Sequence, residues 1–251
     1  MARNKTYQAI VLTVRDSGES NREAVFLTRE EGILRATLFG GPKSKLRSHV
    51  SSFNRGTLWV YHDPVRDNRK VTDFDVETWR PGIREDYGRI LAASFLVELV
   101  LQGHGGGANP EEVYLLLDES LETLAEAQRD QRRHLVLRFI WQYLDILGIF
   151  PDFSHCGSCA CPIGHLDILW YLPGQNLLVC STCRDRAAPS AGLAAIPLYP
   201  GFRRWFREVH KLRGPQALRY TLEDEVLARA IQVGEGLYTA FSGKGIQWHE
   251  E

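Results

Sequence analysis

Long hydrophobic runs are missing from this chain of 251 residues. No apolar stretch approaches the ~18–20 residues that a membrane-spanning helix needs. The first five residues, MARNK, lack the apolar core of a signal peptide. We therefore expect a folded, soluble, cytoplasmic protein with no membrane partner.

Common catalytic and nucleotide-binding motifs are also missing. The chain has no G-x-x-x-x-G-K-[ST], no H-E-x-x-H, no G-x-S-x-G and no intact G-x-G-x-x-G. Residues 104–107, HGGG, match the oxyanion loop of some lipases, but they follow a predicted helix and lack the serine motif. We interpret them as a flexible connector, and the missing motifs argue against a motor, nuclease or polymerase.

Cysteine is scarce, and its distribution is informative. All five cysteines lie between Cys156 and Cys183, an odd and clustered set that argues against a disulfide framework. Cys156 and Cys159 form one C-x2-C pair, Cys180 and Cys183 form another, and 20 residues separate the pairs. This spacing predicts one zinc ion held by four thiolates at ~2.3 Å, a closed and therefore structural site.

Alternatives to this ligand set remain open. The cysteines could be buried without a metal. Three other side chains could compete as ligands: Cys161, His155 and His165. We favour a free thiol for Cys161. A zinc hydrolase or nuclease would need an open coordination position, which four cysteines close.

The charge is balanced overall but unevenly distributed. The chain holds 30 Lys and Arg against 31 Asp and Glu, a net charge of −1. Residues 1–80 are net positive and residues 81–155 net negative, and no acid occurs from residue 32 to residue 62. That window includes Arg35, Lys43, Lys45, Arg47 and Arg55. A polyanion would bind such a surface, because each neutralised phosphate releases counterions; a solvated loop with a chance bias is the other interpretation.

The first 80 residues are patterned as short strands. Segments 7–14, 24–28, 33–39, 57–62 and 70–78 are rich in β-branched and aromatic residues and are separated by turn residues. Five strands so closely spaced predict a small antiparallel barrel, and a five-stranded oligonucleotide-binding (OB) barrel has this size. Its aromatic residues could stack on bases or fill the core, and they are Phe26, Phe39, Phe53, Trp59 and Tyr61.

Helical periodicity begins after residue 81. We expect helices over 87–101, 113–127, 129–147 and 199–212, and a last helix that Thr221 and Asp224 open as a capping box. Segments 168–172 and 176–179 predict a ribbon hairpin between the cysteine pairs. The expected class is α+β multidomain: an OB domain at 1–80, a helical domain at 81–153 and 191–251, and an inserted zinc ribbon-like element at 154–190.

The predicted helix 199–212 has apolar residues at three- to four-residue spacing and basic residues between them. The basic residues are Arg203, Arg204, Arg207 and Lys211. A core-facing stripe with solvated cations explains this pattern. A basic groove for an acidic peptide or for DNA is the alternative.

Two runs of sequence resemble a known family. They are QAIVLTVRDSGESNR at residues 8–22 and FLTREEGILRA at residues 26–36. Together with the order of barrel, apolar helix, interrupted helical domain and four-cysteine segment, they resemble the RecO family of bacterial recombination mediators. Two positions depart from its pattern: Ser17 stands where tyrosine is usual, and Gly41-Pro42 where Ala-Arg is common, so one expected cation is missing.

The resemblance implies a non-enzymatic DNA-repair protein, associated with the nucleoid during repair. Proteins of this family bind single- and double-stranded DNA, anneal complementary strands and contact the acidic C-terminal tail of the single-stranded-DNA-binding protein (SSB). With RecR they help to load RecA onto SSB-covered DNA, and RecF and RecA are indirect partners. The basic stretch 40–47 matches the family's glycine-plus-basic loop.

The resemblance and the charge pattern together give candidate sites. For DNA the candidates are Arg15, Arg22, Arg35, Lys43, Lys45 and Arg47. For the SSB tail they are Arg203, Arg204, Arg207 and Lys211. A protein-interaction scaffold with a structural zinc site and no direct DNA role is the alternative function.

Overall fold

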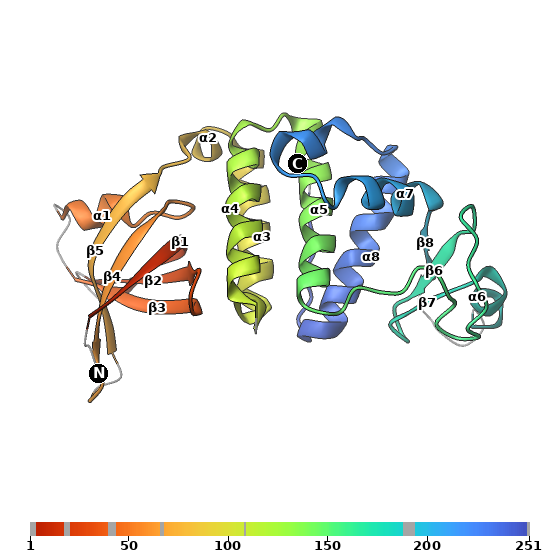
Figure 1. Cartoon of the computed structure of the whole chain (residues 1–251), viewed down its shortest axis with the longest axis horizontal. Coiled ribbons are helices and arrows are strands. Elements are labelled where there is room, and N and C mark those ends of the chain that lie inside the picture. The colour runs from red at the N-terminus through yellow and green to blue at the C-terminus, as the bar shows by residue number, and fades with distance from the viewer. Residues whose placement is uncertain are drawn as a thin grey trace. The chain divides into compact units, whose positions relative to one another are not determined.

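The computed structural model describes residues 4–17, 21–39, 44–65, 68–107, 109–187 and 194–249. The chain divides into two compact units, residues 1–126 and 127–251 (Figure 1). In the described part of the chain, no helix is both long enough and apolar enough to cross a membrane.

The first unit begins with a closed five-stranded barrel in the order β1-β2-β3-β5-β4. Its strands are β1 (Asn4–Ser17), β2 (Asn21–Thr28), β3 (Gly32–Leu38), β4 (Arg55–Asp63) and β5 (Asn68–Thr78). Neighbours are antiparallel except β3 and β5, which meet in parallel where Thr37 pairs with Lys70. β1 pairs with β4 over residues 4–10 and with β2 over residues 9–17, and its pairing with β2 has a register shift between Val11 and Thr13. The predicted OB-type barrel is therefore confirmed, with one parallel contact that the antiparallel prediction lacked.

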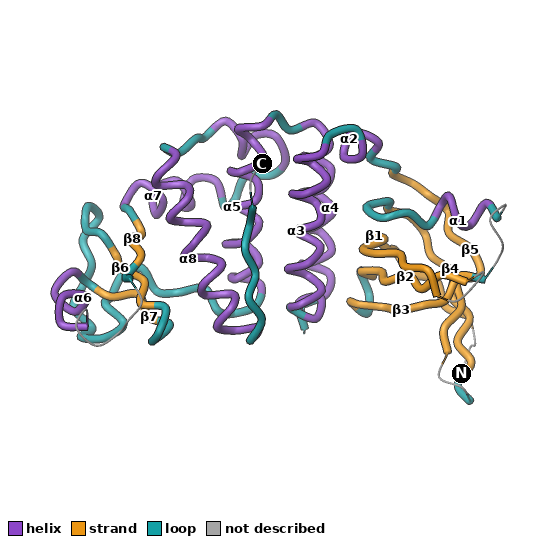
Figure 2. The backbone as a smooth tube through the Cα atoms, turned by 180° about the vertical axis from the view of Figure 1, so that it is seen from behind, coloured by secondary structure: helices purple, strands orange, loops and turns teal. Residues whose placement is uncertain are grey.

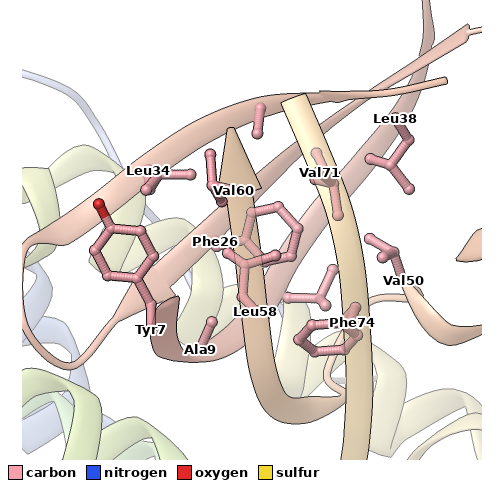
Figure 3. Close-up of a cluster of buried hydrophobic side chains, with 13 residues drawn as sticks. Tyr7, Ala9, Phe26, Leu34, Leu38, Val50, Leu58, Val60, Val71 and Phe74 are labelled. Carbon is pink, nitrogen blue, oxygen red and sulfur yellow. The ribbon is translucent and has the colours of Figure 1, made fainter. Parts of the chain in front are cut away.

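Alternate side chains along each strand point inward and fill the barrel interior. Figure 3 shows Tyr7, Phe26, Leu58 and Phe74 among the buried side chains that converge inside it. The rings of Phe26 and Phe74 lie 6.0 Å apart between centroids. Because Leu58 and Val60 point inward, Trp59 and Tyr61 between and after them lie on the outer face.

A short helix, α1 (Lys45–His49), follows β3 and was not predicted. After the barrel come α2 (Pro81–Arg84), α3 (Tyr87–Gln102), the 3-10 turn η1 (His104–Gly106) and α4 (Pro110–Glu126). α3 and α4 pack side by side (Figure 2), and α4 also contacts β2 and β3. For this reason Val25 and Leu27 are buried although they point away from the barrel interior.

The glycine run is a packed connector rather than a flexible one. A Cβ added to Gly105 would lie 2.8 Å from Cγ1 of Ile33, and one added to Gly106 would lie 2.2 Å from Cγ2 of Val113. Both glycines have positive φ angles. Only glycine therefore fits where η1 passes between β3 and α4.

The second unit combines helices with a small sheet. Its elements are α5 (Arg129–Ile146), β6 (Leu169–Leu172), β7 (Leu177–Val179), α6 (Ser181–Ala187), β8 (Ile196–Leu198), α7 (Pro200–Val209), η2 (Gly214–Arg219) and α8 (Asp224–Ser242). The sheet order is β7-β6-β8, so β8 adds a third strand to the predicted hairpin. Trp141 anchors the helical core: its ring lies 4.6 Å from that of Phe202 and its Nε1 donates to the carbonyl of Ala230.

The predicted capping box of the last helix is wrong. The N-cap of α8 is Glu223, which makes no side-chain capping bond, and the helix begins at Asp224. The first turn of α8 instead carries two acids, Asp224 and Glu225, whose negative charges interact favourably with the positive end of the helix dipole.

Candidate functional site

The four paired cysteines converge. The sulfur atoms of Cys156, Cys159, Cys180 and Cys183 all lie within 4.8 Å of one another, and those of Cys159 and Cys180 are 3.9 Å apart. Four thiolates at ~2.3 Å from a tetrahedral zinc ion would be ~3.8 Å apart. The cluster therefore has the size and donor set of a closed metal site.

Backbone amides favour the thiolate form of Cys156. The N–H groups of Ser158 and Cys180 donate to Sγ of Cys156 at 3.4 and 3.3 Å. Burial disfavours the charged form of Cys156, but amides of Cys159, Cys180 and Ser158 outweigh it and lower the pKa of Cys156 to about 6. Since metals bind the thiolate, this environment suits a metal ligand.

The three competing side chains are not among the four that converge. Cys161 lies beside the cluster: its thiol interacts with those of Cys159 and Cys180, and its carbonyl accepts the N–H of Cys156. His155 is exposed, with Nδ1 3.1 Å from a carboxylate oxygen of Asp152. His165 lines a separate cavity.

Five of the six predicted DNA-binding cations lie on β1, β2, β3 and α1. Arg35 on β3 and Lys45 on α1 are exposed, and Lys43 lies outside the described residues. Asp16 lies 3.0 Å from Nε of Arg22 and 3.6 Å from Nη2 of Arg47. One carboxylate therefore offsets part of the charge of these two cations.

Residues 32–62 contain no acid, but the fold brings acidic residues of neighbouring strands next to them. The acidic strand β5 lies beside β4 and sets Asp73 opposite Trp59 and Asp75 opposite Thr57. On the other side of the barrel, Glu23 of β2 faces Arg15 across the strand pair. At the start of β5, beside β3 and the end of β4, the chain also places basic side chains.

Sequence reasoning missed two cations there, Arg69 and Lys70. Nζ of Lys70 lies 4.9 Å from the ring centroid of Phe39, which is 46% exposed. Pairing of Thr37 with Lys70 creates this neighbourhood, and no local pattern predicts a parallel contact between residues so far apart in sequence. Of the five barrel aromatics, Phe26 and Phe53 are buried, whereas Phe39, Trp59 and Tyr61 are at least partly accessible.

A cavity of about 710 Å³ lies in the second unit, beside α7. Its apolar wall includes Phe150 and Phe206, whose rings stack at 5.3 Å. The remaining lining residues are Asp145, Pro151, Asp152, Phe153, Ser154, Ile163, His165, Arg203, Arg207 and His210. Aromatic, cationic and acidic side chains thus share one cavity.

The four cations predicted on a helix over 199–212 do not form one group, and because α7 ends at Val209, Lys211 lies beyond the helix. Arg203 and Arg207 line the cavity, and Arg204 and Lys211 are exposed outside its lining. Arg203 donates to the carbonyls of Phe153, Gly164 and Asp167, and burial lowers the pKa of its guanidinium. Its main contacts tie α7 to the segment around the first cysteine pair.

An OB-type barrel joined to a helical unit with a four-cysteine ribbon defines a modular protein of the oligonucleotide-binding barrel class. Residues 1–75 match the family model for the recombination protein O N terminal region, and residues 84–232 match that for its C terminal region. The chain therefore belongs to the RecO family of DNA repair proteins.

Individual relatives agree with this assignment. DNA repair protein RecO of Thermobifida fusca is 28% identical over 249 residues, 97% of this chain and 93% of the relative. The Bacillus subtilis protein of the same name is 25% identical over 242 residues, 94% and 89% of the two chains. The Gloeobacter violaceus protein is 32% identical over 163 residues, a match that spans 62% of its length.

Proposed function

We propose that this chain is a non-enzymatic recombination mediator. It binds single- and double-stranded DNA, anneals complementary strands and, with RecR, promotes loading of RecA onto SSB-coated single strands. The observation that carries this proposal is the match of residues 1–75 and 84–232 to the two RecO family models.

The barrel provides the DNA-binding surface. Arg35, Lys45 and Lys70 neutralise phosphates, while Arg15, Arg22, Arg47 and Arg69 contribute less because acids lie near them. Two DNA strands shielded on one cationic surface repel each other less, so complementary strands pair without nucleotide hydrolysis.

One zinc ion at the four cysteines would have a structural role. Bound there, zinc would hold the two C-x2-C turns together, with all four coordination positions filled by sulfur. The ribbon has only a small apolar cluster around Leu172 and Val179, so the metal would contribute much of its stability.

The cavity beside α7 would bind the acidic C-terminal tail of SSB. Its aromatic wall suits an apolar end group, and Arg203 and Arg207 suit carboxylates. We expect Arg207→Ala to weaken binding of a labelled SSB-tail peptide about tenfold, a loss typical of one charge-assisted contact. Arg204→Ala is the matched control, since Arg204 is exposed outside the cavity; equal losses in both variants would reject this site.

Annealing of SSB-coated complementary strands tests the main proposal. The purified chain, without nucleotide, should anneal them at low salt and lose activity as salt rises. No annealing and no DNA binding at low salt would reject the mediator and favour an interaction scaffold.

A further inference from the structure

We propose that Phe39 and Lys70 form a base-stacking site that makes the barrel surface prefer unpaired DNA. The inference rests on the proposed DNA-binding function and assigns its specificity to one pair of side chains. Phe39 follows the last residue of β3, and Lys70 is the third residue of β5.

The barrel register places this pair on the outer surface. Leu34, Ala36 and Leu38 face the barrel core. Because side chains alternate along a strand, the next residue, Phe39, points to the outer surface. Lys70 lies opposite Thr37 on β3 and opposite Tyr61 on β4. An aromatic, a cation and a second aromatic therefore follow one another across three adjacent strands.

The environment of Phe39 differs from that of Trp59, another aromatic residue on the outer face. Phe39 has an ammonium 4.9 Å from its ring centroid and remains 46% exposed, so part of its ring is accessible to a base. Trp59 instead lies opposite the carboxylate-bearing Asp73. A nucleotide stacked on Phe39 would meet a cation, whereas one at Trp59 would meet a negative charge.

Stacking discriminates between DNA forms. In a duplex the faces of the bases are covered by their neighbours, and only edges and phosphates remain accessible. An aromatic ring therefore adds affinity for single strands alone, while lysine and arginine bind both forms through phosphates. A surface of this kind holds the unpaired strands and loses its stacking contact once they have annealed, which favours release of the duplex.

Three probes of equal length, ~16 nucleotides, test the inference by fluorescence anisotropy at low salt. They are an oligo-dT strand, the same backbone with abasic sites throughout, and a duplex. Phe39→Leu should weaken binding of oligo-dT roughly 5- to 150-fold, the effect of one lost stacked base. Its binding of the abasic strand and of the duplex should not change.

Two further variants make the result specific. Phe39→Tyr keeps a ring and should retain the preference for oligo-dT, whereas Trp59→Leu removes the outer aromatic beside Asp73 and should leave all three affinities unchanged. Equal affinity of Phe39→Leu and the original chain for oligo-dT, or an equal loss on all three probes, would overturn the inference. Failure of the original chain to bind any probe would instead overturn the DNA-binding proposal on which it rests.

Discussion

Arg80 is a buried cation at the junction between the barrel and the helices of the first unit. Its side chain is 1% exposed, donates to the carbonyl of Phe53 at 2.7 Å and pairs with Asp118. Both Arg80 and Phe53 have positive φ angles, so the chain is held in an unfavourable backbone conformation at each end of this hydrogen bond.

Arg80→Ala should therefore destabilise the first unit. The change leaves the carbonyl of Phe53 and part of the Asp118 carboxylate without a partner, at a cost of roughly 3 kcal/mol in the free energy of unfolding. Urea denaturation would measure it. Arg35→Ala, at an exposed position, should stay within about 0.5 kcal/mol, and equal effects of the two substitutions would contradict the assignment.

Glu235 makes stability depend on pH. Burial raises the pKa of Glu235 to about 7, although the backbone N–H of Trp248 donates to its carboxylate and opposes the shift. Because the folded pKa exceeds the unfolded value, its protonated form is favoured in the folded state. Stability from this group is complete below about pH 4.5 and is lost as pH rises through about 7.

The second unit should accordingly be less stable at pH 8 than at pH 5, by up to roughly 3 kcal/mol from this group. Glu235→Gln cannot ionise and should flatten the dependence over that range. Thermal unfolding followed at several pH values tests this; an unchanged slope in the variant would assign the pH dependence to other groups.

At the scale of elements, the zinc ribbon should depend on its metal. One zinc per chain is expected by metal analysis, and Cys156→Ser with Cys180→Ser should remove it, since each C-x2-C pair loses one ligand. Proteolysis should then cut within residues 154–187 first, while the barrel retains its DNA affinity. Cys161→Ser should keep the zinc. Zinc retained by the double variant would show that other residues bind it.

Elements with a strong local pattern were predictable from the sequence, and those defined by distant contacts were not. Alternation over Leu58 to Tyr61 predicted β4, and the C-x2-C spacing predicted which cysteines converge. The three-residue β8 has no periodicity of its own and exists because it pairs with β6. The five-residue α1 buries no side chain, so no apolar stripe marks it.

The candidate sites follow the same rule. Exposure of Arg35 and Lys45 agrees with their predicted role, but the proximity of Asp16 to Arg47 depends on how β1 approaches α1. The cavity beside α7 draws its lining from α5, from the chain on either side of the first cysteine pair, and from α7. Sequence patterns describe one segment at a time. They therefore predicted the cations of this cavity but not its aromatic wall.

At the scale of the whole molecule, the proposed DNA-binding cations and the proposed peptide cavity belong to different compact units. Their effects should therefore be separable, because substitutions without shared partners act additively. Arg207→Ala should leave the affinity for naked DNA unchanged, and Arg35→Ala should leave peptide binding unchanged. Anisotropy with each labelled ligand tests both statements, and a crossed effect would show that the two sites are coupled.

The salt dependence of DNA binding measures how many cations touch phosphates. Each contact with a single strand contributes about 0.7 to the slope of log affinity against log salt, so Arg35→Ala with Lys45→Ala should lower it by about 1.4. Arg47→Ala should have a smaller effect, because Asp16 already lies 3.6 Å from its guanidinium. Arg204→Ala, an exposed cation of the other unit, is the matched control for lost charge. If its slope falls as much as that of the double variant, the DNA contacts are not confined to the barrel.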